Sequence, residues 1–261
     1  MVYIYKGKYK IIDNLITACD YYFVLSEVDK AIKNKKRLLI SPIASHTLVR
    51  AHYDKSLKKI LDKFNYLVPD SQWVRWSIPF LYGKEKSLKD RVYGPELMLR
   101  VLNLSVKKNY RVFLYGNTQA VLIKLKEKLK GRFLNLKLVG EEESKFRDLR
   151  EKEWKNLVKN IKNSKANIVF IALGSPKQEV FAYELLKKLK KPFVIIPIGA
   201  AFDFISGNKL QAPKWMQKIG LEWLFRLSKE PGRLLTRYIF YGIMFVFSVL
   251  WQKIRSFSYK E

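Results

Sequence analysis

Short apolar runs rich in Val, Ile and Phe alternate along the chain with longer stretches in which apolar residues recur every three to four positions. The runs predict strands and the longer stretches predict helices. This alternation is typical of an α/β fold, a mostly parallel sheet with helices on both faces. The predicted strands are Arg37–Ser41, Asn65–Val68, Arg111–Tyr115, Leu136–Val139, Asn167–Leu173 and Phe193–Ile198, and the predicted helices are His46–Lys63, Pro95–Lys108, Thr118–Lys130, Glu151–Asn163 and Pro176–Lys190.

Four of the predicted strands are followed by distinctive loops. In a parallel sheet, ligands bind beyond the carboxyl ends of the strands. We therefore expect these loops to converge on one rim, where any chemistry should lie. They are Pro69-Asp70, Gly116-Asn117-Thr118, Gly174–Glu179 and Gly199–Asp203.

The Gly174–Glu179 loop has the residues of a well-capped helix start. Ser175 suits the N-cap, Pro176 the first helical position, and Gln178 would complete a capping box with Ser175. The exposed amides of a helix start also bind phosphate, so a structural and a phosphate-binding role both stay open. Neither this loop nor the one at Gly116 matches GxxxxGK[ST] or GxGxxG, which removes the main support for an ATPase or a dinucleotide-binding protein.

Asp70 follows a strand and has no acidic neighbour in the sequence. A single carboxylate at a strand end can act as a general base if its surroundings raise its pKa. A turn aspartate after proline is the equally open structural alternative. The chain contains no Asp-x-Asp sequence, so no metal held by carboxylates is predicted.

Arginines in the segment from Glu222 to Tyr238 are candidates to neutralise phosphate instead. Pro231 can begin a helix, which would put Arg233 and Arg237 on one face, with Arg226 earlier in the segment. The planar guanidinium group suits diphosphate oxygens. The alternatives are an ion pair between Arg226 and Glu222, and contact of Arg237 with lipid headgroups.

The residues that follow, Tyr238–Trp251, form a run of 14 residues without a charge, flanked by basic residues. As a helix this run would be about 21 Å long. A bilayer core is about 30 Å thick, so the run predicts an interfacial or docked segment rather than a membrane span. An ordinary buried C-terminal helix is the alternative. At the other end, Met1–Asp13 has no long apolar run, so neither a secretory signal nor a first membrane span is predicted there.

The chain of 261 residues is strongly basic, with 51 Lys and Arg against 23 Asp and Glu and a formal charge of +28. Such charge suits nucleic acid, anionic lipid headgroups or phosphorylated substrates. No zinc-finger spacing or RNA-binding motif supports nucleic acid, which stays an alternative without a specific feature. A lone Cys19 excludes an intramolecular disulfide framework, and the two histidines, His46 and His52, give no support for a histidine metal centre, so no cofactor or metal is predicted.

Several strings of residues along the chain match the pattern of one known family. Looser matches in the N-terminal half are Pro69-Asp70, Arg91-Val92-Tyr93-Gly94-Pro95 and Phe113-Leu114-Tyr115-Gly116. The longer and more specific C-terminal matches are Gly174–Glu179, Gly199–Phe204 with Gly207, Ala212-Pro213, Trp215, Gly220–Leu227, Glu230-Pro231, Arg233 and Arg237-Tyr238. In this order the strings resemble the WecG/TagA/CpsF glycosyltransferases (glycosyltransferase family 26), and the resemblance covers the chain from about Arg37 to its end.

This resemblance implies an inverting, metal-independent transferase that moves an N-acetylmannosamine-type sugar from a UDP donor to a polyprenyl-diphosphate-linked sugar in cell-surface polysaccharide synthesis. It implies a catalytic core over residues 1–205 and a helical appendage over residues 206–261 that completes the site and contacts the membrane. The protein would be peripheral, on the cytoplasmic face of the cell membrane. A homo-oligomer is left open.

Carried over by position, the resemblance makes Asp70 the catalytic base. It places the substrate-binding residues at Ser41, Arg91, Gly116, Gln178, Arg226, Arg233 and Arg237. The chain departs from the family pattern at Ile43, Ser71, Gln211 and Gly232, so the exact donor sugar and acceptor are not predicted. The departures at Ile43 and Gln211 leave open a catalytically inactive relative, and the charge leaves open a non-catalytic basic protein that binds nucleic acid or anionic lipid.

Overall fold

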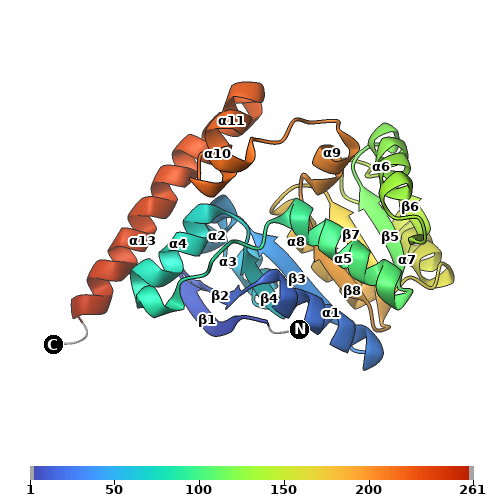
Figure 1. The fold of residues 1–261 in the computed structure, drawn as a ribbon, viewed down its shortest axis with the longest axis horizontal. Helices are drawn as coiled ribbons and strands as arrows, with labels where there is room; N and C mark the ends of the chain where they lie inside the picture. Colours follow the sequence, from blue (N-terminus) through green and yellow to red (C-terminus); the bar gives the residue numbers. More distant parts are fainter. Residues whose placement is uncertain (1–2, 259–261) are drawn as a thin grey trace.

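The computed structural model describes residues 3–258. Residues 1–2 of the predicted catalytic core and residues 259–261 of the predicted appendage lie outside the described residues. The centre of the structure is a six-stranded parallel sheet with helices on both faces (Figure 1). The strand order is β4-β3-β8-β7-β5-β6. The strands are β3 (Leu38–Ile43), β4 (Tyr66–Pro69), β5 (Arg111–Gly116), β6 (Lys137–Glu142), β7 (Ile168–Ala172) and β8 (Val194–Pro197).

All six predicted strands and the α/β class are confirmed. The predicted helices are also present, but His46–Lys63 is two helices rather than one. Asp54 separates them, because its side chain accepts hydrogen bonds from the backbone N–H groups of Ser56 and Leu57 and so begins a new helix. The helices are α2 (Ser45–Tyr53), α3 (Lys55–Leu61), α5 (Gly94–Lys108), α6 (Gln119–Arg132), α7 (Glu151–Asn163) and α8 (Lys177–Leu189).

Several elements were not predicted from the sequence. An antiparallel hairpin forms a separate two-stranded sheet, and a helix follows it. Another helix begins just after Asp70 and contains Pro79 in its interior. The unpredicted elements before residue 207 are β1 (Tyr5–Ile11), β2 (Asn14–Cys19), α1 (Tyr21–Lys33), α4 (Gln72–Tyr82), the short 3₁₀ turn η1 (Lys84–Lys86) and α9 (Ala201–Ser206).

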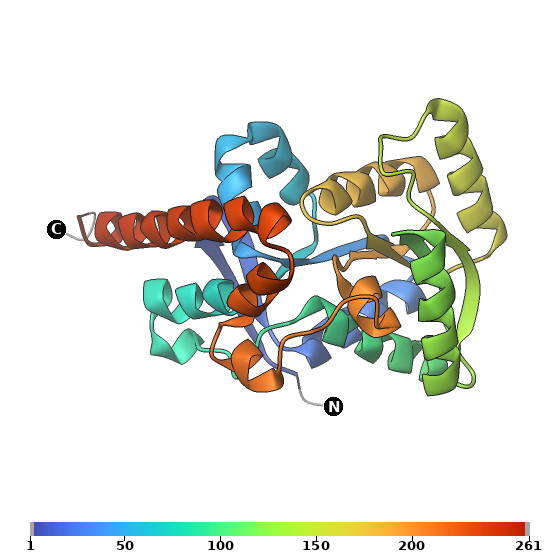
Figure 2. The same ribbon diagram turned by 90° about the horizontal axis from the view of Figure 1, so that it is seen from above.

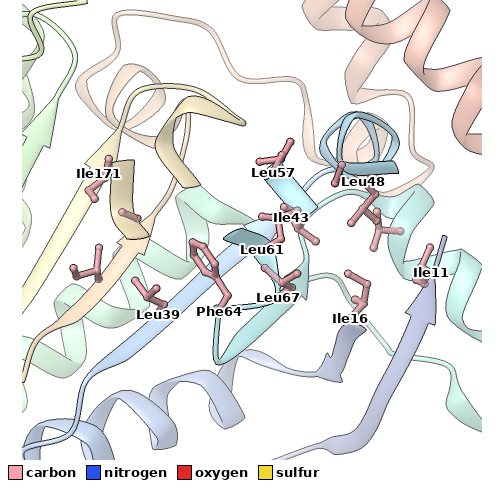
Figure 3. Packing of buried hydrophobic residues seen from close by; sticks show 14 of the residues in the cluster. Ile11, Ile16, Leu39, Ile43, Leu48, Leu57, Leu61, Phe64, Leu67 and Ile171 are labelled. Atoms are coloured by element: carbon pink, nitrogen blue, oxygen red, sulfur yellow. The ribbon is translucent and has the colours of Figure 1, made fainter. Parts of the chain in front are cut away.

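Side chains of the central strands alternate between the two faces of the sheet. On β7, Ile168 and Phe170 face one core, while Val169 and Ile171 face the other. The first core packs against α1, α5, α6 and α9, and the second packs against the remaining core helices together with the hairpin. Figure 3 shows part of the second core, where Ile43 of β3 lies among Leu48 of α2 and Leu57 and Leu61 of α3. Both faces are therefore covered, as a central parallel sheet requires.

The C-terminal part of the described chain is helical and lies beside the sheet domain. Its elements are α10 (Lys214–Lys218), α11 (Glu222–Lys229), α12 (Pro231–Leu235), the π-helical turn η2 (Thr236–Phe240) and α13 (Tyr241–Ser258). The last helix lies along α2 and α4 (Figures 1 and 2). Phe245 and Val249 are buried there, and the side chain of Gln252 accepts from Ile12 N and donates to Lys10 O, both at 2.7 Å.

The apolar C-terminal segment is longer than the uncharged run suggested. Helix α12, the π turn and α13 are continuous, and Pro231–Ser256 is a helix of 26 residues with mean hydropathy 1.6. At 1.5 Å per residue this is about 39 Å. By length and composition it is one helix able to cross a membrane, so the expectation that the segment is too short to span was wrong. The helix extends through charged residues on both sides of the apolar run.

Candidate active site

Two cavities meet beside the carboxyl ends of the strands. The large cavity has a volume of about 1180 Å³ and is lined by all four of the loops predicted to converge, including Asn117, Gly174 and Gly199. The small cavity has a volume of about 380 Å³ and lies between the start of α4 and the C-terminal helices. Four residues line both: Ala44, Asp70, Arg226 and Arg237.

Asp70 is positioned by the end of β4 and by the start of α5. Its Oδ1 accepts a hydrogen bond of 2.8 Å from the backbone N–H of Gly94. Its Oδ2 has no hydrogen-bond partner among residues 3–258 and is available to a ligand. Burial raises the pKa of Asp70 above its ordinary value, and the Arg91 guanidinium and the Gly94 amide oppose this rise. A half-buried carboxylate with a raised pKa and one free oxygen is suited to accept a proton.

Arg91 links the sheet domain to the C-terminal helices. Its Nη2 forms a 2.6 Å ion pair with Oε2 of Glu222 on α11, and both side chains are almost fully buried. The Tyr93 hydroxyl donates to Oε1 of the same carboxylate at 3.0 Å, and Gln211 Nε2 donates to that hydroxyl. Glu222 is therefore held by Arg91, and the alternative of an ion pair between Arg226 and Glu222 is wrong. Arg91 also lines the small cavity.

Arg226 and Arg237 place positive charge where the two cavities meet. Within residues 3–258, neither forms an ion pair with a carboxylate, and the buried Nε of Arg237 has no hydrogen-bond partner. Burial, together with the charges of Arg226 and Arg233, lowers the pKa of Arg237. Buried donors without acceptors are costly, so this pair of guanidinium groups suits an anionic ligand.

Arg233 differs from the other two arginines. It lines only the large cavity, and its Nε donates to Glu230 Oε2 at 2.8 Å while about half of its side chain is exposed. Arg233 is thus exposed and paired with Glu230, whereas Arg237 is buried and has no carboxylate partner among residues 3–258. Across residues 3–258, no group of three or more His, Cys, Asp or Glu side chains is arranged to hold a metal ion.

Gln178 and Glu179 form a buried hydrogen-bond network at the start of α8. Gln178 Oε1 accepts from Gly199 N at 2.8 Å, and its Nε2 donates to Glu179 Oε1 at 3.0 Å. The carboxylate of Glu179, which is fully buried, also accepts from Ser41 Oγ at 3.0 Å and from Ser175 Oγ at 2.8 Å. Burial raises the pKa of Glu179, and these donors oppose the rise. The network fixes the Gln178 amide in the wall of the large cavity.

This network corrects the predicted helix start. The helix begins at Lys177, with Pro176 at the N-cap position after a cis peptide bond, and no side chain caps it. The Ser175 hydroxyl donates to Glu179 instead of accepting from a backbone amide, and Gln178 bonds to Gly199 instead of to the N-cap. The predicted capping box was therefore wrong, because two buried side-chain contacts replaced it.

Ser41 and Gly116 lie behind the cavity walls rather than in them. Ser41 is fully buried and contacts Glu179. Gly116 has a φ of 115°, and a Cβ there would lie 2.5 Å from the carbonyl oxygen of Ala172 on β7. The lack of a side chain lets β5 approach β7 closely, which presents Asn117 to the large cavity. Neither residue lines the large or the small cavity, and their predicted contact with substrate stays a prediction.

His46 is a site residue that sequence reasoning did not select. It is buried, lines the small cavity, and its Nε2 lies 3.4 Å from the Ser175 carbonyl oxygen. Burial, reinforced by Arg237, holds the pKa of His46 well below its ordinary value, so the imidazole is neutral at pH 7. Trp73 also lines this cavity, and its only sequence signal was proximity to Asp70. Trp223 lines it too, and the sequence analysis cited this residue only within the Gly220–Leu227 string.

The departures from the family pattern have simple structural explanations. Ile43 is fully buried in the core, and Ser71 accepts a hydrogen bond from Val74 N and caps α4. Gln211 donates to the hydroxyl of Tyr93. Ser71 lines the small cavity, whereas Ile43 and Gln211 line neither cavity.

Comparison with known proteins identifies relatives over most of the chain. The glycosyl transferase WecG/TagA/CpsF family matches residues 9–259. An N-acetylglucosaminyldiphosphoundecaprenol N-acetyl-beta-D-mannosaminyltransferase from Bacillus subtilis (strain 168) is 30% identical over 203 residues, which are 77% of this chain and 75% of the relative. A protein of the same name from Bacillus spizizenii (strain ATCC 23059 / NRRL B-14472 / W23) is 31% identical over 174 residues, 67% of this chain and 64% of that relative.

Proposed function

This chain belongs to the WecG/TagA/CpsF glycosyltransferase family, and from that premise we propose that it transfers an N-acetylmannosamine-type sugar from a UDP donor to a polyprenyl-diphosphate-linked sugar. Family membership makes it a glycosyltransferase, not the non-catalytic basic protein that its charge also allowed. The names of both relatives specify a mannosaminyl donor group and a lipid-diphosphate acceptor. At about 30% identity these names support a substrate class for this chain rather than one sugar.

The observation that carries the proposal is the place of Asp70, at the junction of two cavities of different character. The large cavity lies over the strand ends and suits a nucleotide sugar. The small cavity is walled by aliphatic and aromatic residues of the C-terminal helix, such as Ile243 and Phe247, and suits the sugar and first isoprene units of a lipid-linked acceptor. A base at the junction can reach both substrates.

We propose a single displacement. Asp70 takes the proton from an acceptor hydroxyl, and that oxygen forms a bond to the anomeric carbon of the donor sugar from the face opposite UDP. The bond from the anomeric carbon to the diphosphate oxygen breaks, and UDP leaves with the electron pair, which inverts the configuration. Arg226 and Arg237 stabilise the negative charge that develops on the leaving diphosphate, a task that a metal ion performs in other transferases.

The raised pKa of Asp70 fits this role. A general base works best when its pKa lies near the working pH, and burial moves this carboxyl in that direction. The positive charges of Arg91 and Arg226 favour the carboxylate form and oppose this rise of the pKa. Gln178, held by Glu179 and Gly199, would orient the donor in the large cavity.

We further propose a peripheral location on the cytoplasmic face of the membrane. The continuous helix Pro231–Ser256 is long enough to span, but the contacts of its α13 part with the sheet domain continue from Phe245 to Lys253. A helix held along the domain over this length lies beside it and cannot cross the bilayer while the domain stays in water. The exposed side of α13 would then be buried in the headgroup and acyl boundary.

The proposal is tested by supplying UDP-N-acetylmannosamine and a short-chain lipid-diphosphate-linked N-acetylglucosamine, and by following UDP release and the disaccharide product. UDP-N-acetylglucosamine serves as the matched donor control. We expect product from the first donor, formed with inverted anomeric configuration. Absence of transfer from any UDP-sugar, with no thermal stabilisation by UDP, would contradict the proposal.

A further inference from the structure

We propose that α4 of the sheet domain forms a second part of the membrane contact surface, so that the protein binds an anionic phospholipid bilayer through α4 and α13 together. This inference rests on the proposed peripheral location. It adds that the contact is made by the domain that carries Asp70, and not by the C-terminal helices alone.

Helix α4 packs one side against the core but exposes aromatic side chains on its other side. Trp73 is 41% exposed and Phe80 is 45% exposed, although both belong to a helix whose other side is buried in the core. On α13, Phe247 is 68% exposed and Trp251 is 56% exposed. Scattered exposed apolar residues are ordinary, whereas a contiguous apolar patch marks an interaction site.

The exposed residues of α4 and α13 lie side by side. Trp73 and Phe247 line the same small cavity. Further along the helices, the ammonium group of Lys253 lies 5.9 Å from the centre of the Phe80 ring. The two helices run next to each other in both views of the ribbon (Figures 1 and 2). The apolar residues therefore form one surface on two helices.

The chemistry of this surface favours a lipid bilayer. Trp and Tyr side chains lie at membrane interfaces, and basic residues beside them attract anionic headgroups. Basic side chains stand at the C-terminal ends of both helices, Lys84 and Lys86 after α4 and Arg255 on α13. A second copy of this chain is the other candidate for covering the surface, but the formal charge of +28 on each copy opposes that association.

The position of α4 gives this contact a consequence for the reaction. Its N-cap is Ser71, the residue directly after Asp70. Helix α4 has 11 residues, about 16 Å in length, so Phe80 and Asp70 are held at a fixed separation. A bilayer that anchors the far end of α4 therefore sets the height of the carboxylate above the headgroups, where a lipid-linked diphosphate would lie.

The test uses the full chain and vesicles of phosphatidylcholine with 25% phosphatidylglycerol. Phe80→Ser is expected to weaken sedimentation with these vesicles about fivefold or more, because the lost burial of an aromatic side chain amounts to that factor. Leu134→Ser is the matched control: Leu134 is 91% exposed but lies next to β6, at the opposite edge of the sheet, and its loss should leave vesicle binding unchanged.

A second variant, Phe80→Trp, tests the same surface in case Phe80→Ser does not fold. Phe80→Trp should bind vesicles at least as well as the unmodified chain, and its added fluorescence should be quenched by brominated lipid. Unchanged sedimentation of Phe80→Ser, with no additional quenching in Phe80→Trp, would overturn the proposal. So would a dimer in solution that Phe80→Ser dissociates while vesicle binding stays the same, because the surface would then join two copies.

Failure of the inference can be told from failure of the proposed function. Phe80 lines neither cavity, so Phe80→Ser should keep its stabilisation by UDP and its transfer to a water-soluble, short-chain acceptor. Its transfer to an acceptor embedded in vesicles should fall with vesicle binding. If the unmodified chain transfers no sugar but the vesicle results hold, the surface stands and the proposed function fails.

Discussion

Buried charge is treated in opposite ways in two regions around the large cavity. Under the strand ends, the Glu179 carboxylate accepts hydrogen bonds from three side chains, so the fold satisfies it completely. On the C-terminal helices, Arg237 keeps a buried Nε without a partner among residues 3–258, and no carboxylate pairs with it there. An unsatisfied buried donor costs about 1–3 kcal/mol. The buried charge of the first region therefore has its hydrogen-bond partners after folding, whereas the second region gains a partner for its buried donor when an anionic ligand binds.

This difference separates positioning from chemistry. The Glu179 network holds Gln178 and its neighbours in place before any substrate arrives, so it serves preorganisation. The guanidinium groups of Arg226 and Arg237 have no carboxylate partner among residues 3–258, so their positive charge can stabilise an anion that enters the cavity. Asp70 lies between these roles, with one oxygen held by Gly94 and the other free.

The largest expected effect is a loss of sugar transfer when the negative charge of the Asp70 carboxylate is removed. Asp70→Asn keeps the shape and the hydrogen bond from Gly94 but cannot accept the acceptor proton, so kcat should fall about 1000-fold. The measurement is sugar transfer under saturating donor and acceptor. Asp62→Asn, at the exposed end of α3, is the control and should retain full activity. A folded Asp70→Asn protein with undiminished transfer would rule out Asp70 as the base.

The second prediction compares kcat/KM after substitution of Arg237, which has no carboxylate partner among residues 3–258, and of Arg233, which pairs with Glu230. Arg237→Gln should lower kcat/KM for the UDP-sugar about 100-fold, because it removes a buried donor from the developing diphosphate charge. Arg233 is half exposed and already bound to Glu230, so Arg233→Gln should cost about fivefold or less. Steady-state kinetics of both variants give the ratio. Equal losses would show that pairing within the protein does not distinguish the two arginines.

The third effect tests whether the Glu179 network is completed by folding. Glu179→Ala removes the carboxylate that accepts from Ser41, Ser175 and Gln178, and it should reduce the free energy of unfolding by about 3 kcal/mol. It should also raise KM for the donor more than it lowers kcat, since Gln178 loses its anchor. Glu151→Ala, which breaks only an exposed ion pair with Lys155, should cost less than about 1 kcal/mol. Urea unfolding and donor titration measure both quantities.

The smallest expected effect is a pH-dependent gain in stability in Asp70→Asn. The pKa of Asp70 is raised in the folded protein, so its contribution to stability is fully present below the ordinary carboxyl pKa and is lost as pH rises through the folded value. Asparagine cannot ionise and avoids this loss. The free energy of unfolding of Asp70→Asn should therefore exceed that of the unmodified chain by an amount that grows upward from about pH 4. A constant difference across pH would contradict the raised pKa.

The sheet could be predicted from sequence because its strands are short apolar runs buried on both faces. Residues 168 to 171 of β7 show this directly, since every side chain is buried. The hairpin was missed because β1 alternates Lys and Tyr and pairs only with β2, so its pattern resembles a solvated segment. Helix α4 was missed because Pro79 and its aromatic residues obscure the helical period.

The site was predictable where a residue directly follows a strand, and less so where side chains meet across the fold. Asp70 and Gln178 line the large cavity, as the strand-end rule leads one to expect. The partner of Glu222 could not be read from spacing, because Arg91 is distant in the chain and lies closer than the arginine one helical turn away. Ser175 was assigned to a cap because its buried acceptor, the Glu179 carboxylate, becomes evident only in three dimensions.

The ion pair between Arg91 and Glu222 joins the last helices to the body of the protein with little exposure to water. Breaking such a pair on one side leaves an isolated charge in a dry environment, which costs several kcal/mol. The C-terminal segment is thus not an interchangeable tail. A chimera that receives the terminal helices of another family member should work only if those helices carry a carboxylate at the position of Glu222 to pair with Arg91.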